Sequence, residues 1–376
     1  MNNYLSYLES RPRKPFLMSL MLLLVVVGAI DYITGVEVSF SALYLVPVAL
    51  GAWVLGRRTG VFFSIVSAIV WYLADFMSSP SYSHPLIPYW NALVMLAGFL
   101  TTALVLARLK QTIDGENRLA REIQERLLPR EIPRVAGYEI AGAWRPAQSV
   151  SGDYYDVITL DDDLLAFCVG DVVGHGIPAA LLMSNLQAAV RMLAISKLPP
   201  REICTQLNKF IFSNTTRDKF ITFFYGVLDI SKREFVYTNA GHNRPLLMRT
   251  NGDRISPSEG GIALGLLPDF GYNQGRVHLE EGDLLLLYTD GVVEARNLRN
   301  ELFDDERLLN VLEENHTKGA TATCNSILQV VSEFSKGIYQ DDLTLLALSV
   351  QAPDSKWEEM SARQRGSVEE TRISIL

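Results

Sequence analysis

Residues 167–182 read FCVGDVVGHGIPAALL, and this stretch decides how the C-terminal part of the chain folds. An apolar run leads into Asp171 and then into two glycines that flank His175. Pro178 follows, and proline is favoured in the first turn of a helix. The pattern predicts a buried strand, a tight turn and a helix. A buried, unpaired carboxylate is costly or takes up a proton. Asp171 therefore needs partners from elsewhere in the chain.

The composition of the chain is both acidic and unusually rich in hydrophobic residues. The chain has 376 residues, of which 48% are hydrophobic, and a formal net charge of -8 with a pI near 5.3. An acidic chain lacks the basic surface that nucleic acid requires, so we expect no nucleic-acid partner. The three cysteines, Cys168, Cys204 and Cys324, form no CxxC pair. We interpret them as buried thiols.

The hydrophobic excess lies near the N-terminus, in four nearly uncharged segments at 16–33, 40–56, 61–77 and 87–107. Their length suits a hydrocarbon core about 30 Å thick, so residues 1–107 are predicted to form a four-helix transmembrane bundle. Basic residues flank the segments on one side: Arg11, Arg13, Lys14, Arg57, Arg58, Arg108 and Lys110. The positive-inside rule then places both ends in the cytoplasm. We expect a multi-pass protein of the inner, cytoplasmic membrane.

Residues 108–134 are predicted to form a linker helix. Leu109, Ile113, Ala120 and Ile123 keep a spacing of three or four residues, which Glu116 interrupts. Such spacing indicates either a short parallel coiled coil, hence a homodimer, or an amphipathic helix on the next domain. A shift in the bundle could then regulate the domain that follows. At the other end of the chain, 351–376 is polar and without periodicity, which is typical of a loosely held tail.

From residue 135 to 350 the chain alternates short apolar strands with turn residues. The strands include YEIAGAW, LLAFCVG, FITFFYGVLDI, DLLLLYT and LTLLALSV, and they are close neighbours in sequence. Neighbouring strands favour antiparallel pairing. Helical patterns interrupt the strands at about 178–196, 200–214, 304–314 and 320–336. The fold class is therefore α+β, with two packed sheets and helices outside.

Acidic residues stand at the ends of four predicted strands. They are Asp153, Asp171, Asp290 and the neighbouring Asp341 and Asp342. Each motif alone is compatible with an ordinary turn. If the strand ends share one edge of the sandwich, however, the carboxylates repel one another unless cations lie between them. Oxygen ligands without cysteine select Mg²⁺ or Mn²⁺. Two such ions activate water for phosphate-ester hydrolysis, which is the reaction class that we expect.

Together the motifs resemble the SpoIIE/RsbU-type serine phosphatases, a branch of the metal-dependent PPM (protein phosphatase 2C-like) superfamily. The resemblance covers about 121–350 and rests on AREIQERLLP, SGDYYDV, GDVVGHGIPAALLM, NAGHNRPLL, EGDLLLLYTDGVVEARN and DDLTLL. It implies an αββα sandwich, two Mn²⁺ or Mg²⁺ ions, and dephosphorylation of phosphoserine or phosphothreonine. The implied substrate is often an anti-anti-sigma partner with a STAS domain. Ser151 departs from the family pattern, in which glycine is common.

The resemblance also implies the metal ligands. They are Asp153, Asp171 with the backbone carbonyl of Val172, Asp290, and the Asp341–Asp342 pair, and which member of that pair binds directly stays open. His175 and His242 are candidates for general acids, with structural hydrogen bonding as the favoured alternative. Other candidates are Asn239 and Asn243 as loop-fixing residues, Asp156 as an acceptor near the ions, and Arg145 and Arg244 as phosphate contacts.

The sequence thus predicts a membrane-anchored, metal-dependent serine/threonine phosphatase. Its expected parts are the bundle at 1–107, the linker at 108–134, the phosphatase domain at 135–350 and the tail at 351–376. A phosphatase-like binding module without turnover is the alternative function. A nucleotide cyclase is disfavoured because the chain has no GGDEF signature.

Overall fold

The computed structural model describes residues 13–34, 40–78 and 82–351. All but the first residue of the predicted tail lies outside this part of the chain. The chain divides into two compact units, Met1–Arg118 and Leu119–Leu376. The division falls inside the segment predicted as a linker, and a single helix, α5 (Ile87–Glu125), runs through it.

The N-terminal unit is helical. It contains α2 (Arg13–Thr34), a short 3₁₀ turn η2 (Ser41–Tyr44) that continues into α3 (Leu45–Val54), α4 (Arg57–Ser78) and the first part of α5. Among the described residues, α2, α4 and α5 are long and apolar enough to cross a membrane. The η2–α3 segment, Ser41–Val54, is apolar but shorter. The helix Ile177–Ala194 also meets the length and composition criteria, but it lies within the C-terminal unit.

Small residues and one carboxylate hold the N-terminal helices together. A Cβ on Gly60 would lie 2.6 Å from the Cβ of Ala52, so α3 and α4 approach as closely as only glycine allows. Asp31 is 8% exposed. It accepts hydrogen bonds from the Tyr44 hydroxyl at 3.1 Å and from the Phe40 amide at 3.2 Å. These bonds attach the end of α2 to η2.

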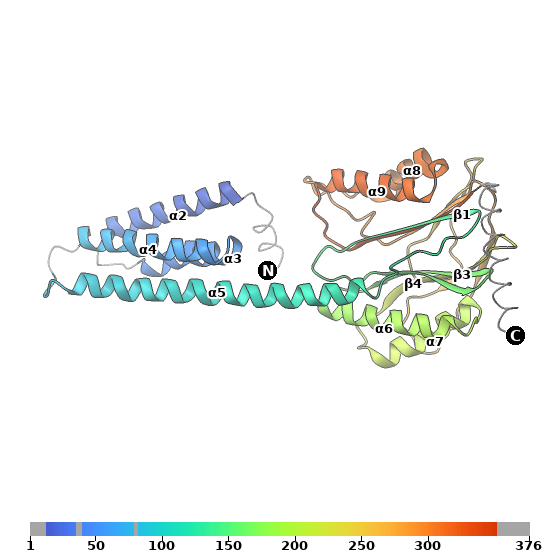
Figure 1. The fold of residues 1–376 in the computed structure, drawn as a ribbon, viewed down its shortest axis with the longest axis horizontal. Helices are drawn as coiled ribbons and strands as arrows, with labels where there is room; N and C mark the ends of the chain where they lie inside the picture. Colours follow the sequence, from blue (N-terminus) through green and yellow to red (C-terminus); the bar gives the residue numbers. More distant parts are fainter. Residues whose placement is uncertain (1–12, 35–39, 79–81, 352–376) are drawn as a thin grey trace, which may run out of the picture. The chain divides into compact units, whose positions relative to one another are not determined.

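The C-terminal unit is built on two sheets (Figure 1). The first sheet has the order β1-β11-β10-β6-β7, and all of its pairs are antiparallel. Its strands are β1 (Tyr138–Arg145), β6 (Leu246–Met248), β7 (Arg254–Ile255), β10 (Leu284–Tyr288) and β11 (Leu343–Val350). Because β11 lies between β1 and β10, it is buried along its whole length.

The second sheet has the order β2-β3-β4-β5-β8, with β9 also paired to β5. Its strands are β2 (Tyr154–Asp161), β3 (Leu164–Val172), β4 (Ile221–Asp229), β5 (Glu234–Ala240), β8 (Gly260–Gly261) and β9 (Gly275–His278). The pairing is antiparallel, as the short connections predict, except between β5 and β8, which run parallel.

Helices cover the outer face of each sheet (Figure 1). The helices α6 (Ile177–Ala194) and α7 (Pro200–Asn214) pack on the second sheet, and α8 (Asp304–Asn315) lies beside α9 (Ala320–Ser335), which packs on the first. The unit is therefore an αββα sandwich, which confirms the fold class expected from the sequence.

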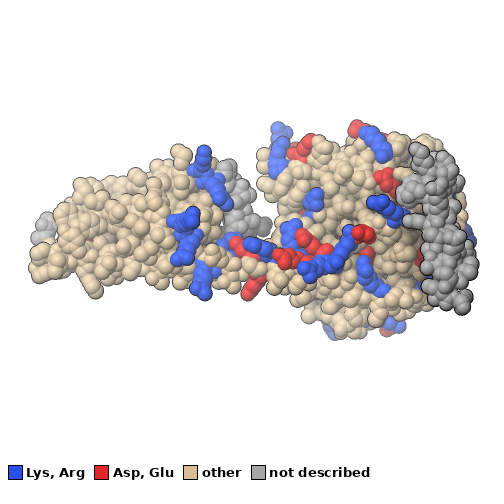
Figure 2. Space-filling model, in the orientation of Figure 1, with Lys and Arg blue, Asp and Glu red and all other residues tan. Residues whose placement is uncertain are grey.

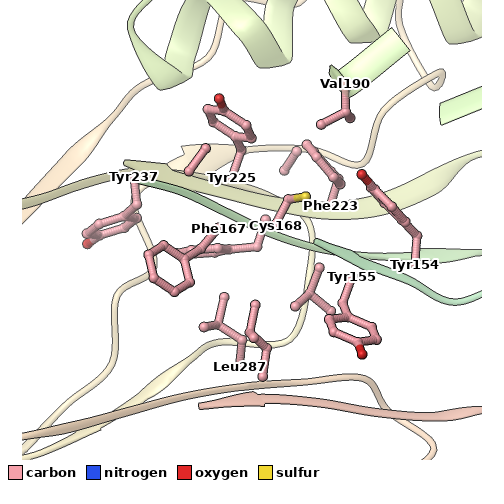
Figure 3. Close-up of a cluster of buried hydrophobic side chains, with 14 of the residues drawn as sticks. Tyr154, Tyr155, Phe167, Cys168, Val190, Phe223, Tyr225, Tyr237 and Leu287 are labelled. Carbon is pink, nitrogen blue, oxygen red and sulfur yellow. The ribbon is translucent and has the colours of Figure 1, made fainter. Parts of the chain in front are cut away.

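Strand β3, which lies between β2 and β4, is buried on both faces, because a sheet covers one face and helices cover the other. Figure 3 shows the resulting alternation. Phe167 points toward Leu287 of the opposite sheet, whereas Cys168 points toward α6 and Val190. Both side chains are 0% exposed. A strand buried on both faces appears as a continuous apolar run rather than an alternating one, and LLAFCVG has this form.

Candidate active site

Antiparallel pairing brings the acidic strand ends together in two groups. In the second sheet, Tyr154 at the start of β2 pairs with Gly170 near the end of β3, so Asp153 lies beside Asp171. In the first sheet, Tyr288 at the end of β10 pairs with Leu345 near the start of β11. Asp290 therefore lies close to Asp341 and Asp342.

Hydrogen bonds join these two groups across the sandwich. The Asp153 carboxylate, from the second sheet, accepts bonds from the hydroxyls of Thr289 at 2.8 Å and Thr344 at 2.6 Å, which belong to the first. In the opposite direction, Asp342 accepts bonds from the backbone amides of Ala147 at 2.7 Å and Gly152 at 2.8 Å. The five predicted aspartates therefore share one edge of the core.

The electrostatics of this edge are those of crowded carboxylates. Burial and the neighbouring charges of Asp290, Asp341 and Asp342 raise the pKa of Asp171 to about 7. Burial, together with the charges of Asp341 and Glu294, raises the pKa of Asp290 to about 6.

Burial, with Asp171 and Asp342 nearby, raises the pKa of Asp153 well above its ordinary value. Burial also raises the pKa of Asp342. Shifts of this kind mean that the ionised site is unfavourable without positive charge.

Two glycines allow the close approach of the backbone at this edge. A Cβ on Gly291 would lie 1.9 Å from the Asp342 carbonyl oxygen, so only glycine can follow Asp290 here. A Cβ on Gly152 would lie 3.1 Å from the carbonyl oxygen of Val172. The Val172 carbonyl, which the family resemblance implicates, is thus next to the loop that carries Asp153.

The chemistry of the donors fits a hard divalent cation. The five aspartates gathered here offer carboxylate oxygens, and Mg²⁺ and Mn²⁺ prefer oxygen ligands. Within the described part of the chain, no group of three carboxylate, imidazole or thiol side chains is already arranged around one point at metal-ligand spacing. The fit therefore rests on the type, burial and mutual repulsion of the donors.

His242 makes hydrogen bonds of the kind that a structural role requires. Its backbone amide donates to Asn239 Oδ1 at 2.7 Å, and Asn239 Nδ2 donates back to the His242 carbonyl at 3.0 Å. The His242 ring contacts Thr222 Oγ1 at 2.8 Å through Nδ1. Burial lowers its pKa to about 4. His175 and Arg244, in contrast, are exposed on loops.

Asp156 was expected to be an acceptor near the ions, but its contacts in the structure are with other groups. It is 0% exposed and makes a bidentate ion pair with Arg191 of α6, with distances of 2.8 and 3.1 Å. The Tyr154 hydroxyl also donates to it at 2.9 Å. Asp156 therefore attaches α6 to the second sheet. Arg145 ends β1 opposite Leu343, the residue after Asp342, and its side chain is exposed at the same edge.

The sequence analysis did not predict the contacts of several polar residues at this edge. Thr289 and Thr344 interrupt or flank apolar strands, which is a signal for buried hydroxyls with a partner. Gln124 and Ser151 bond to each other beneath the loop that carries Asp153. Gln124 occurs in a segment that otherwise has the composition of a solvated helix, and no local pattern marks it.

Two known protein families match this chain, one in each part of it. The family described as Stage II sporulation protein E (SpoIIE) matches residues 161–351. A second family, a domain of unknown function (DUF4118), matches residues 15–126.

Individual proteins agree with the first match. Phosphoserine phosphatase RsbU of Bacillus subtilis is 31% identical over 241 residues, which is 64% of this chain and 71% of RsbU. The structure of the RsbU and RsbW domains of Rv1364c from Mycobacterium tuberculosis is 29% identical, with a TM-score of 0.54, over 61% of this chain and 64% of that one. The SiaA-PP2C domain of Pseudomonas aeruginosa is 21% identical, with a TM-score of 0.57, over 64% of this chain and 98% of that one, and supports the fold.

The fold, the five carboxylates at one edge of the sandwich, and the comparisons all indicate the same family. The chain belongs to the SpoIIE family of PP2C-type protein serine/threonine phosphatases.

Proposed function

We propose that this protein is a membrane-anchored phosphoserine phosphatase that uses two Mg²⁺ or Mn²⁺ ions at the edge of the sandwich. The observation that supports this most directly is the gathering of five aspartates from four distant strand ends, where burial and mutual repulsion raise the pKa of Asp171 to about 7. The proposed ligands are Asp153, Asp171, the Val172 carbonyl, Asp290, Asp341 and Asp342.

The chain's own groups prepare this site for a phosphate ester. Divalent ions bound there would supply positive charge and a water molecule of lowered pKa. The Thr289 and Thr344 hydroxyls orient Asp153 without neutralising its charge. Asp342 holds the backbone of the loop at 146–153 through two amides. Arg145, which is exposed at the same edge, is proposed to contact the phosphate group of the substrate.

The proposed substrate is a phosphoserine on a signalling protein. RsbU, the relative with 31% identity, carries the name phosphoserine phosphatase. The family resemblance favours a STAS-domain anti-anti-sigma factor as the phosphoprotein.

The N-terminal unit is proposed as the anchor in the inner, cytoplasmic membrane. Figure 2 shows Lys and Arg side chains gathered toward one end of this unit, while the rest of its visible face has no charged side chain. Two basic residues begin α2 and two begin α4, and two more lie within α5: Arg13, Lys14, Arg57, Arg58, Arg108 and Lys110. The positive-inside rule supports a cytoplasmic phosphatase domain.

A homodimer through α5 is proposed as well. The apolar residues predicted to form a coiled-coil seam are exposed in the single chain: Leu109 is 48%, Ile113 37% and Ile123 55% exposed. Apolar residues at this spacing are typically covered by a second helix.

Activity of the full chain in detergent tests the proposal. We expect hydrolysis of p-nitrophenyl phosphate with Mn²⁺ and none after chelation by EDTA. Asp290→Asn should lower kcat by at least about 100-fold, because an ion stabilises transition-state charge by several kcal/mol. Asp162→Asn, at an exposed turn, is the matched control and should leave kcat unchanged. Activity that persists in EDTA would refute the metal mechanism, and inactivity with bound Mn²⁺ would favour a silent binding module.

A further inference from the structure

Lys219 lies at the edge of the second sheet where the proposed metal ligands gather. Val172, at the end of β3, pairs with Ile221, at the start of β4. The backbone bonding continues past these strand ends, because the Val173 amide donates to the Phe220 carbonyl at 3.1 Å. Lys219 is the residue before Phe220. It therefore lies beside the turn that follows Val172.

The ammonium group of Lys219 reaches this turn. Its Nζ donates to the Val173 carbonyl at 3.4 Å. A Cβ on Gly174 would lie 3.1 Å from the same Nζ, and Gly174 has a φ of +94°, which residues with a side chain rarely adopt. Glycine at this position therefore leaves room for the ammonium group, next to the backbone that offers the Val172 carbonyl.

The backbone on both sides of Lys219 is held in place. Its own amide donates to the Thr216 carbonyl at 2.9 Å. Two residues further on, Ile221 and Leu264 exchange both backbone bonds, at 3.0 and 2.8 Å. These bonds fix the start of the Lys219 side chain without the help of a charged partner.

The charge of Lys219 is not used by the protein itself. The side chain is half-buried, yet it forms no ion pair with any residue that the structure describes. By contrast, Lys197 and Lys232 each pair with an aspartate. An ammonium group has three donors, and the Val173 carbonyl takes one of them. The remaining donors and the positive charge are available to an anion.

We propose that Lys219 binds the phosphate group of the phosphoserine substrate. A phosphate monoester carries nearly two negative charges at pH 7, and an ammonium group binds its oxygens as a point charge. Arg145 is proposed to contact the same group from the first sheet, so the two cations would hold it from opposite sheets. This inference rests on the proposed phosphatase function and adds to it a substrate contact that no sequence motif marks.

The alternative role for Lys219 is to balance the charge of the crowded aspartates. The two roles differ in what they predict for metal binding. A lysine that neutralises carboxylates competes with divalent ions, so its removal should tighten Mn²⁺ binding. A lysine that binds substrate should leave the Mn²⁺ affinity nearly unchanged, and its removal should weaken phosphate binding instead.

The experiment uses inorganic phosphate, the product of the reaction, as an inhibitor of p-nitrophenyl phosphate hydrolysis by the full chain in detergent with Mn²⁺. We expect Lys219→Met to raise the inhibition constant about 10–100-fold, which is the usual effect of losing a charged hydrogen-bond donor. Lys219→Arg keeps the charge and should stay within about 5-fold of the unchanged chain. Lys232→Met is the matched control at the other end of β4, where the lysine pairs with Asp229, and should change the constant less than about 2-fold.

Calorimetry separates binding from turnover. Phosphate titrated into the Mn²⁺-loaded chain should bind Lys219→Met about 10–100-fold more weakly than the unchanged chain, whereas Mn²⁺ titrated into the metal-free chains should bind both within about 2-fold. Lys219→Gln removes the charge with a shorter side chain and carries the same test if Lys219→Met does not fold.

Three results would overturn the inference. They are equal phosphate affinity in Lys219→Met and the unchanged chain, equal weakening by Lys219→Met and Lys219→Arg, and no phosphate binding by the unchanged Mn²⁺-loaded chain. Tighter Mn²⁺ binding by Lys219→Met at equal phosphate affinity would assign the lysine to charge balance. If the unchanged chain binds phosphate but hydrolyses no ester, the proposed function fails, while the comparison of phosphate affinities still decides the role of Lys219.

Discussion

Asp153 illustrates how single residues prepare the site for a cation. A carboxylate buried to 1% exposure normally has a basic partner, yet the donors to Asp153 are the hydroxyls of Thr289 and Thr344. Neutral donors fix the direction of the carboxylate but leave its charge uncompensated. The charge therefore remains available for a metal ion. An arginine at either threonine would have stabilised the metal-free protein at the expense of metal binding.

His242 should make the fold sensitive to acid. Its pKa is about 4 in the folded chain because the ring is buried, whereas an unfolded histidine has a pKa near 6.5. The unfolded state therefore takes up the proton first. The stability contributed by the neutral ring is complete above pH 6.5 and is lost as the pH falls toward 4. Relative to His242→Gln, the unchanged chain should lose about 2 kcal/mol between pH 7 and pH 5.

Chemical unfolding of both chains in metal-free detergent solution, followed by near-ultraviolet circular dichroism, measures this difference. Comparing the two chains at each pH removes the contribution of the aspartates, which both contain. A constant difference between the chains from pH 7 to pH 5 would show that His242 is not buried in its neutral form.

Among the elements, α6 is held on the second sheet by one ion pair in addition to its buried apolar side chains. Arg191 is the bidentate partner of the fully buried Asp156. Removing the arginine leaves an uncompensated buried charge, which is far more costly than losing a surface pair. Arg191→Met should therefore lower the free energy of unfolding by about 2–4 kcal/mol. Lys197→Met, which breaks an exposed pair with Asp161, should have little effect.

Chemical unfolding of the two variants at pH 7.5 provides the comparison. Since Arg191 does not contact the proposed ligands directly, Mn²⁺ affinity offers a second measurement and should change less than stability does. Equal stability of Arg191→Met and Lys197→Met would mean that the pair does not hold α6.

The elements also show what a sequence can and cannot predict. Amphipathic or apolar periodicity placed α7 at Pro200–Asn214 and the other helices of the C-terminal unit within a few residues of their bounds. Long apolar runs likewise predicted β3, β4, β10 and β11. The order of strands within each sheet was not predictable, because β11 inserts between β1 and β10 through contacts that no local pattern encodes. For the same reason, the aspartates could be identified singly, but the contacts of Asp156 and Gln124 could not.

At the scale of the whole molecule, the distribution of charge predicts how the chain lies in a membrane. The starts of α2 and α4 carry Arg13, Lys14, Arg57 and Arg58, whereas the segment between α4 and α5 contains His84 and no Lys or Arg. The cytoplasmic side attracts the basic loops. The connection before α5 should therefore face away from the cytoplasm, and the catalytic unit should face into it.

Labelling with a membrane-impermeant thiol reagent tests this orientation. The native cysteines, Cys168, Cys204 and Cys324, are buried and should give little background. In intact spheroplasts, His84→Cys should react, whereas Arg58→Cys should react only after the membrane is opened. The reverse pattern would invert the proposed topology and separate the catalytic unit from any cytoplasmic phosphoprotein. Labelling at both positions before lysis would show that α4 does not cross the bilayer.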